Sequence, residues 1–202
     1  MTHAEPLSSN SSALAVLKSA TQHEHEALDT ALDLMNSEID AATYRRHLEA
    51  FFGIYAPMEH ALAAVEGWSE HGIDLPARCK AEALRADLVT LGVDEPDALP
   101  MCETLPSLPG LATAFGSLYV LEGASLGGRL ISRHVEKQFG YTAAHGARYF
   151  NGYGARTGEM WMTFRSAVDA YGAEPGRQDE MIAGALATFV AFREWCAQQA
   201  TA

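Results

Sequence analysis

The chain has 202 residues, an ordinary globular share of hydrophobic residues at 48%, and a formal net charge of −12. This length suits one domain with its own core, and this charge disfavours nucleic acid and anionic membranes as partners. No apolar run is long enough to cross a membrane, and the polar, serine-rich start lacks the pattern of a signal peptide. Cys79, Cys102 and Cys196 form no CxxC pair, which is typical of a reducing compartment. We therefore expect a cytoplasmic protein.

Apolar residues recur with the helical period almost everywhere, and the two-residue alternation of strands is missing. The sequence predicts an all-α fold with one helical domain over 12–202, after a polar tail over 1–11. The expected elements are a helix from Ser12 to beyond Leu28, a second from Thr43 that Pro57 disturbs, a third over 77–91 that stops at Gly92, a proline-rich linker over 93–109, a long glycine-interrupted helix over 111–139, and two helices over 158–171 and 178–198.

The first helix carries two histidines that differ in their expected surroundings. With about 100° of rotation per residue, His25 falls in the middle of the apolar stripe, whereas His23 faces solvent. Lys18 lies on the flank of the stripe, and Asp29 follows His25 by one turn. A buried histidine can be satisfied by a backbone carbonyl, or it can bind a metal such as haem iron while Asp29 orients its ring. The helix alone leaves both interpretations open.

Three glycines interrupt the long helix over 111–139. Gly123, Gly127 and Gly128 each cost about 1 kcal/mol relative to alanine inside a helix. Such a cost is typical of positions where another helix packs closely, or where a flat ligand approaches the backbone. The spacing by itself does not choose between these explanations.

Together the two helices resemble a known family. Residues 17–25 (Leu-Lys-Ser-Ala-Thr-Gln-His-Glu-His) and 118–128 (Leu-Tyr-Val-Leu-Glu-Gly-Ala-Ser-Leu-Gly-Gly) are similar to the haem oxygenases. The bacterial branch is the nearest in pattern, and some of its members supply biliverdin to phytochromes. The resemblance also covers residues 44–59, 84–92 and 152–165, and so extends over most of the chain.

The resemblance implies an enzyme that cleaves haem, its cofactor and its substrate, to biliverdin, carbon monoxide and free iron. Oxygen and an external electron donor would be required (a ferredoxin, a flavoprotein reductase or ascorbate), since no flavin or nicotinamide site is recognisable. By this resemblance His25 is the iron ligand on the first helix, and Gly123 and Gly127 form the catalytic wall of the distal helix. The further candidate haem contacts are Lys18, Thr21, Asp29, Ser125, Gly128 and Arg165, of which Lys18 and Arg165 would meet the propionates.

One position departs from the family pattern. Animal haem oxygenases carry an aspartate after the first distal glycine, where it organises water beside bound oxygen, but this chain has Ala124. Ser125 or Glu122 are the neighbouring alternatives, although neither occupies the same side of the helix. The departure keeps a second hypothesis open, a non-catalytic haem carrier or sensor.

A third hypothesis is a helical di-iron oxidase. Its bundle site requires Glu-x-x-His motifs, and none of the 8 histidines has a glutamate three residues before it. A helical interaction protein without a cofactor would leave the distal glycines unexplained.

Overall fold

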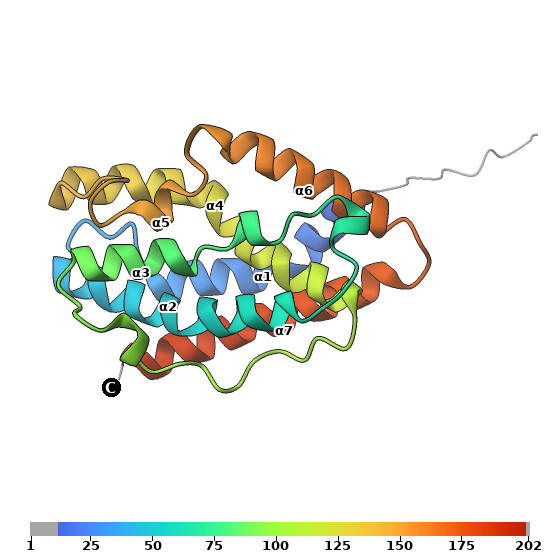
Figure 1. The fold of residues 1–202 in the computed structure, drawn as a ribbon, viewed down its shortest axis with the longest axis horizontal. Helices are drawn as coiled ribbons and strands as arrows, with labels where there is room; N and C mark the ends of the chain where they lie inside the picture. The colour runs from blue at the N-terminus through green and yellow to red at the C-terminus, as the bar shows by residue number, and fades with distance from the viewer. Residues whose placement is uncertain (1–11, 201–202) are drawn as a thin grey trace, which may run out of the picture.

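Helices make up most of the chain in the computed structural model, which describes residues 12–200, and these residues form no β-strand (Figure 1). The all-α prediction is confirmed, whereas the predicted tail over 1–11 lies outside the described residues. The α-helices are α1 (Ala13–Leu32), α2 (Ala41–Ala63), α3 (Ala81–Thr90), α4 (Leu111–Phe139), α5 (Arg148–Asn151), α6 (Thr157–Tyr171) and α7 (Arg177–Ala200). Four 3₁₀ turns join them: η1 (Ser69–His71), η2 (Pro76–Arg78), η3 (Pro96–Ala98) and η4 (Gly154–Arg156).

The two helices that carry the sequence motifs form as predicted. The side chain of Ser12 caps α1 by accepting a hydrogen bond of 3.2 Å from the amide of Ala15. Helix α4 runs without a break through its glycines and ends at Gly140, whose φ of 74° is the left-handed conformation common after a helix. The two motifs therefore lie on continuous helices, which fixes the side each residue faces.

The prediction that Pro57 disturbs the second helix is wrong. Helix α2 continues through Pro57, which has no N–H to donate to the carbonyl of Gly53. The amide of Cys102, from the proline-rich linker, donates to that carbonyl instead at 2.7 Å. Gly53 also allows the linker to approach closely, because an added Cβ would lie 2.5 Å from the carbonyl oxygen of Pro100. A distant segment thus replaces the hydrogen bond that proline removes.

The third helix starts later than predicted, and one short helix was not predicted. Residues near 77 form the turn η2, and α3 begins at Ala81, where the carboxylate of Glu59 accepts hydrogen bonds from the amides of Lys80 and Ala81. Helix α5 is capped in the same way by Asp87, whose carboxylate accepts from two amides at its start. Both caps come from residues far away in the chain, so local sequence gives no signal for them.

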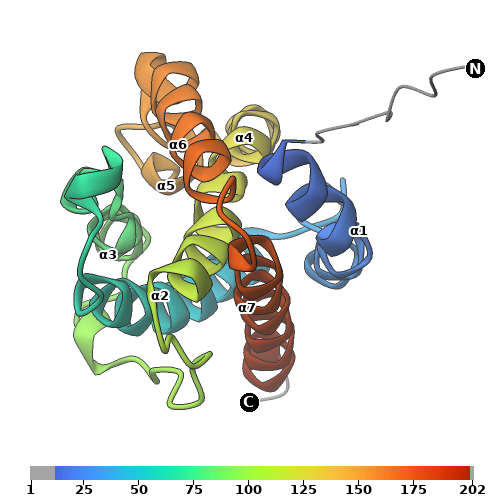
Figure 2. The ribbon, with the colours of Figure 1, turned by 90° about the vertical axis from the view of Figure 1, so that its right-hand side faces the viewer.

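Helix α7 holds α1 and the first half of α4 together around one hydrophobic core (Figure 2). Small residues allow α4 and α7 to approach closely, since a Cβ at Gly116 would meet the backbone of Met181 and a Cβ at Gly184 would meet that of Thr113. No described helix combines the length and apolarity needed to cross a membrane.

Candidate haem-binding site

Helices α1 and α4 run in the same direction (Figure 1), and one side-chain contact joins the middle of α1 to the first half of α4. The hydroxyl of Tyr119 on α4 hydrogen-bonds to the side chain of Thr21 on α1, and Thr21 is 1% exposed. Burial raises the pKa of Tyr119, although this hydrogen bond opposes the shift. Beyond this contact the next turn of α1 carries His25 and the next turn of α4 carries Gly123. The two predicted motifs therefore both lie one turn beyond the Thr21–Tyr119 contact, one on each helix.

A second contact joins the same two regions further along. His134 Nε2 on α4 lies 3.1 Å from the carbonyl oxygen of Asn36, just after α1, and Gln138 donates to the carbonyl of Ser37 at 2.9 Å. His134 follows Tyr119 by fifteen residues, which is about 22 Å of helix. Between the two contacts α1 and α4 share few close approaches. We call the region between the Thr21–Tyr119 contact and the Asn36–His134 contact the α1–α4 opening.

His25 projects at the opening and is not buried. Its side chain is 55% exposed, so the prediction of a buried imidazole is wrong. Helix α1 packs mainly on α7 and α6 and makes few close approaches to α4, so α4 does not cover His25. One edge of the ring contacts Phe189 of α7, with centroids 5.8 Å apart and planes at 70°. His23 is also exposed, as predicted.

Asp29 makes the contact expected of it. Its Oδ2 lies 3.1 Å from Nδ1 of His25, one helical turn away. In neutral imidazole a hydrogen on Nδ1 leaves the lone pair on Nε2, which is the arrangement of a histidine that binds a metal. The pair therefore presents Nε2 as the available ligand atom.

The glycines of α4 divide into two groups with different surroundings. A Cβ built at Gly123 or Gly127 meets no atom within 4 Å, so neither glycine is required for helix packing. A Cβ at Gly128 would lie 2.6 Å from the carbonyl oxygen of Phe150, so Gly128 is required for packing. Gly123 and Gly127 lie four and eight residues after Tyr119, on the face that borders the opening.

Two predicted haem contacts lie on the other side of α4. Gly128 packs on Phe150, and Ser125 is 7% exposed with its side chain toward Gly152. Both face the segment after α5 and not the opening, because they follow Gly123 at spacings that place them across the helix. Their contact with haem stays a prediction, and in this structure both residues pack against the protein itself.

Exposed apolar side chains border the opening and were not predicted from the sequence. Leu126 and Leu130 on α4 are 45% and 62% exposed, and Met35, just after α1, is 53% exposed. Leu126 and Leu130 each follow one of the open glycines by three residues, so they share its face. Apolar residues gathered beside a glycine stripe are typical of a site for a flat apolar ligand.

The two predicted cations lie near the start of α1. Lys18 is exposed and precedes His25 by seven residues, which is two turns on the same face. Arg165 on α6 is half exposed, with Nε 3.8 Å from Asp169, and Asp169 accepts a hydrogen bond from the amide of Leu14. Positive charge is therefore available at this end of the site, where acidic groups of a ligand would be stabilised.

The departure at Ala124 is not compensated by its neighbours. Ala124 is exposed, Ser125 faces the segment after α5, and the carboxylate of Glu122 is bound by Arg78 and Lys80 inside the protein. The described residues thus provide no carboxylate on the glycine face. They do provide an oriented histidine, two glycines with open space above them, exposed apolar side chains and nearby cations, and this set of groups fits haem.

The comparisons with known proteins show which family and which fold this chain has. The family model described as "Heme oxygenase" matches residues 11–198. A heme oxygenase of Xanthomonas campestris is 32% identical over 174 residues, which cover 83% of this chain and 96% of the relative. The NO- and CO-bound heme oxygenase of Neisseria meningitidis superposes with a TM-score of 0.77 at 22% identity, over 94% of this chain and 92% of that one. The heme oxygenase of Leptospira interrogans gives a TM-score of 0.75 at 18% identity, over 93% and 99%. The chain belongs to the haem oxygenase family.

Proposed function

We propose that this protein is a haem oxygenase that opens the ring of haem, using oxygen and external electrons, to give biliverdin, carbon monoxide and free iron. The observation that carries the proposal is the position of His25 opposite a glycine stripe with open space above it. His25 is oriented by Asp29 at 3.1 Å, and Gly123 and Gly127 each leave room for a ligand against the backbone of α4.

Each residue of the site would have a separate role in binding haem. His25 Nε2 would hold the iron, and Lys18 and Arg165 would pair with the propionates at the start of α1. Gly123 and Gly127 would let the backbone of α4 lie against the ring and restrict which ring edge oxygen reaches. When bound, the haem iron supplies the activation of oxygen, and a histidine ligand lacks the electron push by which thiolate favours O–O cleavage.

The experiment combines hemin, ascorbate or a reductase system, and air, and follows the visible spectrum with time. We expect the haem band to decay while a broad red-absorbing biliverdin band grows and carbon monoxide is released. Haem that stays intact through repeated reduction and exposure to oxygen would contradict the proposal.

One observation favours a second candidate function, a haem carrier or sensor. Ala124 is exposed where the family pattern in animals has an aspartate, so the protein itself offers no carboxylate there to hold a water. A carrier would bind haem through His25 and release it intact. The same experiment separates the candidates, because only the oxygenase produces biliverdin and carbon monoxide.

We also propose that the electron donor is external, a ferredoxin, a flavoprotein reductase or ascorbate, and that the biliverdin passes to a phytochrome. The resemblance to the bacterial branch, some of whose members supply biliverdin to phytochromes, supports a phytochrome as the acceptor. The free thiols of Cys79, Cys102 and Cys196 support a separate proposal, that the protein acts in the reducing cytoplasm. A pull-down from cell extract with haem-loaded protein tests both partners.

A further inference from the structure

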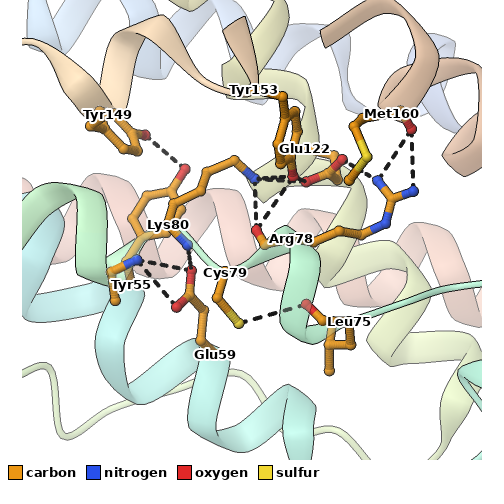
Figure 3. A network of polar contacts seen from close by, with 11 residues as sticks. Tyr55, Glu59, Leu75, Arg78, Cys79, Lys80, Glu122, Tyr149, Tyr153 and Met160 are labelled. Atoms are coloured by element: carbon orange, nitrogen blue, oxygen red, sulfur yellow. Dashed lines mark hydrogen bonds and ion pairs between the residues drawn. The ribbon is translucent and has the colours of Figure 1, made fainter. Parts of the chain in front are cut away.

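A buried carboxylate lies directly before the glycine stripe. Glu122 on α4 is 1% exposed, and it accepts hydrogen bonds from Arg78 Nη1 at 2.5 Å, Lys80 Nζ at 2.6 Å and the hydroxyl of Tyr153 (Figure 3). The three donors come from two segments, the residues around η2 and the loop after α5. Glu122 is therefore held from two directions at once.

The two cations are themselves held in place. The guanidinium of Arg78 donates to the carbonyl of Met160 at 3.2 Å and lies 5.6 Å from the ring centre of Phe164. The ammonium of Lys80 donates to the carbonyl of Arg78 at 3.3 Å and lies 5.1 Å from the ring centre of Tyr153. Both side chains are almost fully buried, so Glu122 cannot move far without leaving two buried cations unpaired.

This network lies on the side of α4 away from the opening. Three successive turns of α4 contact the segment over 150–153: Glu122 contacts Tyr153, Ser125 contacts Gly152, and Gly128 contacts Phe150. Glu122 supplies the only charged contact of these three. A rotation of α4 about its axis would stretch the hydrogen bonds of Glu122 and would turn Gly123 and Gly127 away from His25.

A buried ion network is weak support for stability, because apolar residues of similar volume often stabilise a core equally well. Its best-attested use is to select one arrangement over others of similar energy. The network around Glu122 would select one rotational position of α4 about its own axis.

We propose that Glu122 is a positioning residue that sets, through Arg78, Lys80 and Tyr153, which edge of the haem the wall formed by Gly123 and Gly127 leaves open to oxygen. The inference rests on the proposed haem oxygenase function. Glu122 touches neither haem nor oxygen in this role. It determines which meso carbon is attacked, and therefore which isomer of biliverdin forms.

The test compares Glu122→Gln with the matched variant Asp97→Asn. The matched variant also neutralises a carboxylate that pairs with an arginine, but in the exposed Arg85–Asp97 pair. We expect wild type and Asp97→Asn to give one predominant biliverdin isomer. Glu122→Gln should give a mixture, with haem affinity changed less than about tenfold. Amide hydrogen exchange of the peptide over 119–128, measured without haem, should be faster only in Glu122→Gln.

Tyr153→Phe provides a second variant in case Glu122→Gln folds poorly, since it removes one donor and leaves all charges in place. We expect a smaller change of the isomer ratio in the same direction. An unchanged isomer ratio and unchanged exchange in the folded variants, with only a lower melting temperature, would overturn the inference while the proposed function stands. Failure of the wild-type protein to make any biliverdin would instead overturn the proposed function, and this inference with it.

Discussion

The Nδ1 atom of His25 and the carboxylate of Asp29 lie 3.1 Å apart on successive turns of α1, at the edge of the α1–α4 opening. This contact distinguishes His25 from His23, which lies on the same helix and is also exposed to solvent. A metal-binding histidine usually donates its second ring nitrogen to a carboxylate or carbonyl, and the partner fixes the orientation of the ring. Exposure alone would not have separated the two histidines.

The first prediction is that His25→Ala abolishes the spectrum of histidine-ligated haem, whereas His23→Ala retains it. Only His25 combines an oriented ring with a position opposite the glycine stripe. Haem titrations followed in the visible region measure both variants, with imidazole added to His25→Ala to restore the missing ligand. Equal losses in the two variants would mean that the iron binds elsewhere.

The second prediction concerns Asp29. We expect Asp29→Ala to retain haem binding while weakening the iron–histidine interaction, with affinity or turnover reduced by roughly 10- to 100-fold. The Fe–His stretching frequency of the reduced complex should fall, because a ring without a carboxylate partner is a weaker donor. Asp33→Ala, just past the end of the same helix, serves as the control and should leave that frequency unchanged. A frequency unaltered by Asp29→Ala would assign this contact to helix stability alone.

The third prediction concerns the cations near the start of α1. Exposed charge pairs contribute little, so Lys18→Ala and Arg165→Ala should each weaken haem binding only roughly two- to fivefold. The effect should disappear with haem dimethyl ester, whose propionates carry no charge. It should also shrink as the salt concentration rises. Equal losses with haem and with the ester would show that the two side chains act by packing and not by charge.

The fourth prediction is a dependence of stability on pH that originates at Asp87. Burial raises the pKa of this carboxyl above 3.8, although the amides of Arg148 and Tyr149 donate to it. A raised folded-state pKa favours the folded protein at low pH, and this contribution is lost as the pH rises through that pKa. The stability of wild type relative to Asp87→Asn should therefore increase as the pH is lowered from about 7 to about 4, close to the ordinary pKa of an aspartate.

Asp97 provides a control of opposite sign for the same measurement. Its hydrogen bond with Arg85 lowers its pKa, so its contribution is present above the unfolded value and is lost as the pH falls. Urea unfolding midpoints at the two pH values measure both differences. A wild-type advantage over Asp87→Asn that shrinks on acidification would contradict the assignment.

The helices and the family could be predicted from the sequence because both depend on local pattern. The period of apolar residues and the stop at Gly140 define α4 from Leu111 to Phe139 without any tertiary information. The path of α2 through Pro57 could not be predicted in this way, because it depends on a hydrogen bond from Cys102 to Gly53. The same holds for α5, which is capped by Asp87 from a different part of the chain.

The sequence indicates which face of its helix each candidate site residue occupies, but not what surrounds that residue in the fold. A helical wheel places His25 on the apolar stripe of α1, but it cannot show that the neighbouring helices leave the ring 55% exposed. It likewise cannot show which glycine touches a neighbour. Gly127 and Gly128 are adjacent in sequence, and only the position of Phe150 distinguishes their roles.

The fifth prediction uses this difference between adjacent glycines. Gly123→Ala and Gly127→Ala should each stabilise the protein by about 1 kcal/mol, because alanine is the better helix former and its Cβ meets no atom within 4 Å. Gly128→Ala should destabilise it by about 1–3 kcal/mol, because its Cβ would overlap the carbonyl of Phe150. Thermal unfolding without haem measures all three.

Substitutions at the same three positions should affect turnover in the opposite order, when Gly123 and Gly127 are replaced by leucine. Gly123→Leu and Gly127→Leu extend the side chain into the opening, where it would occupy the space between the backbone of α4 and the ring of the haem. We expect these folded proteins to bind haem and to lose most of their biliverdin yield, whereas the folded fraction of Gly128→Ala should keep a normal yield per molecule. If all the glycines served helix packing, stability would fall in every variant and the remaining folded protein would turn over normally. Full biliverdin yield in Gly123→Leu and Gly127→Leu would remove the distal wall from the site, because the open space above these glycines would then have no part in the reaction.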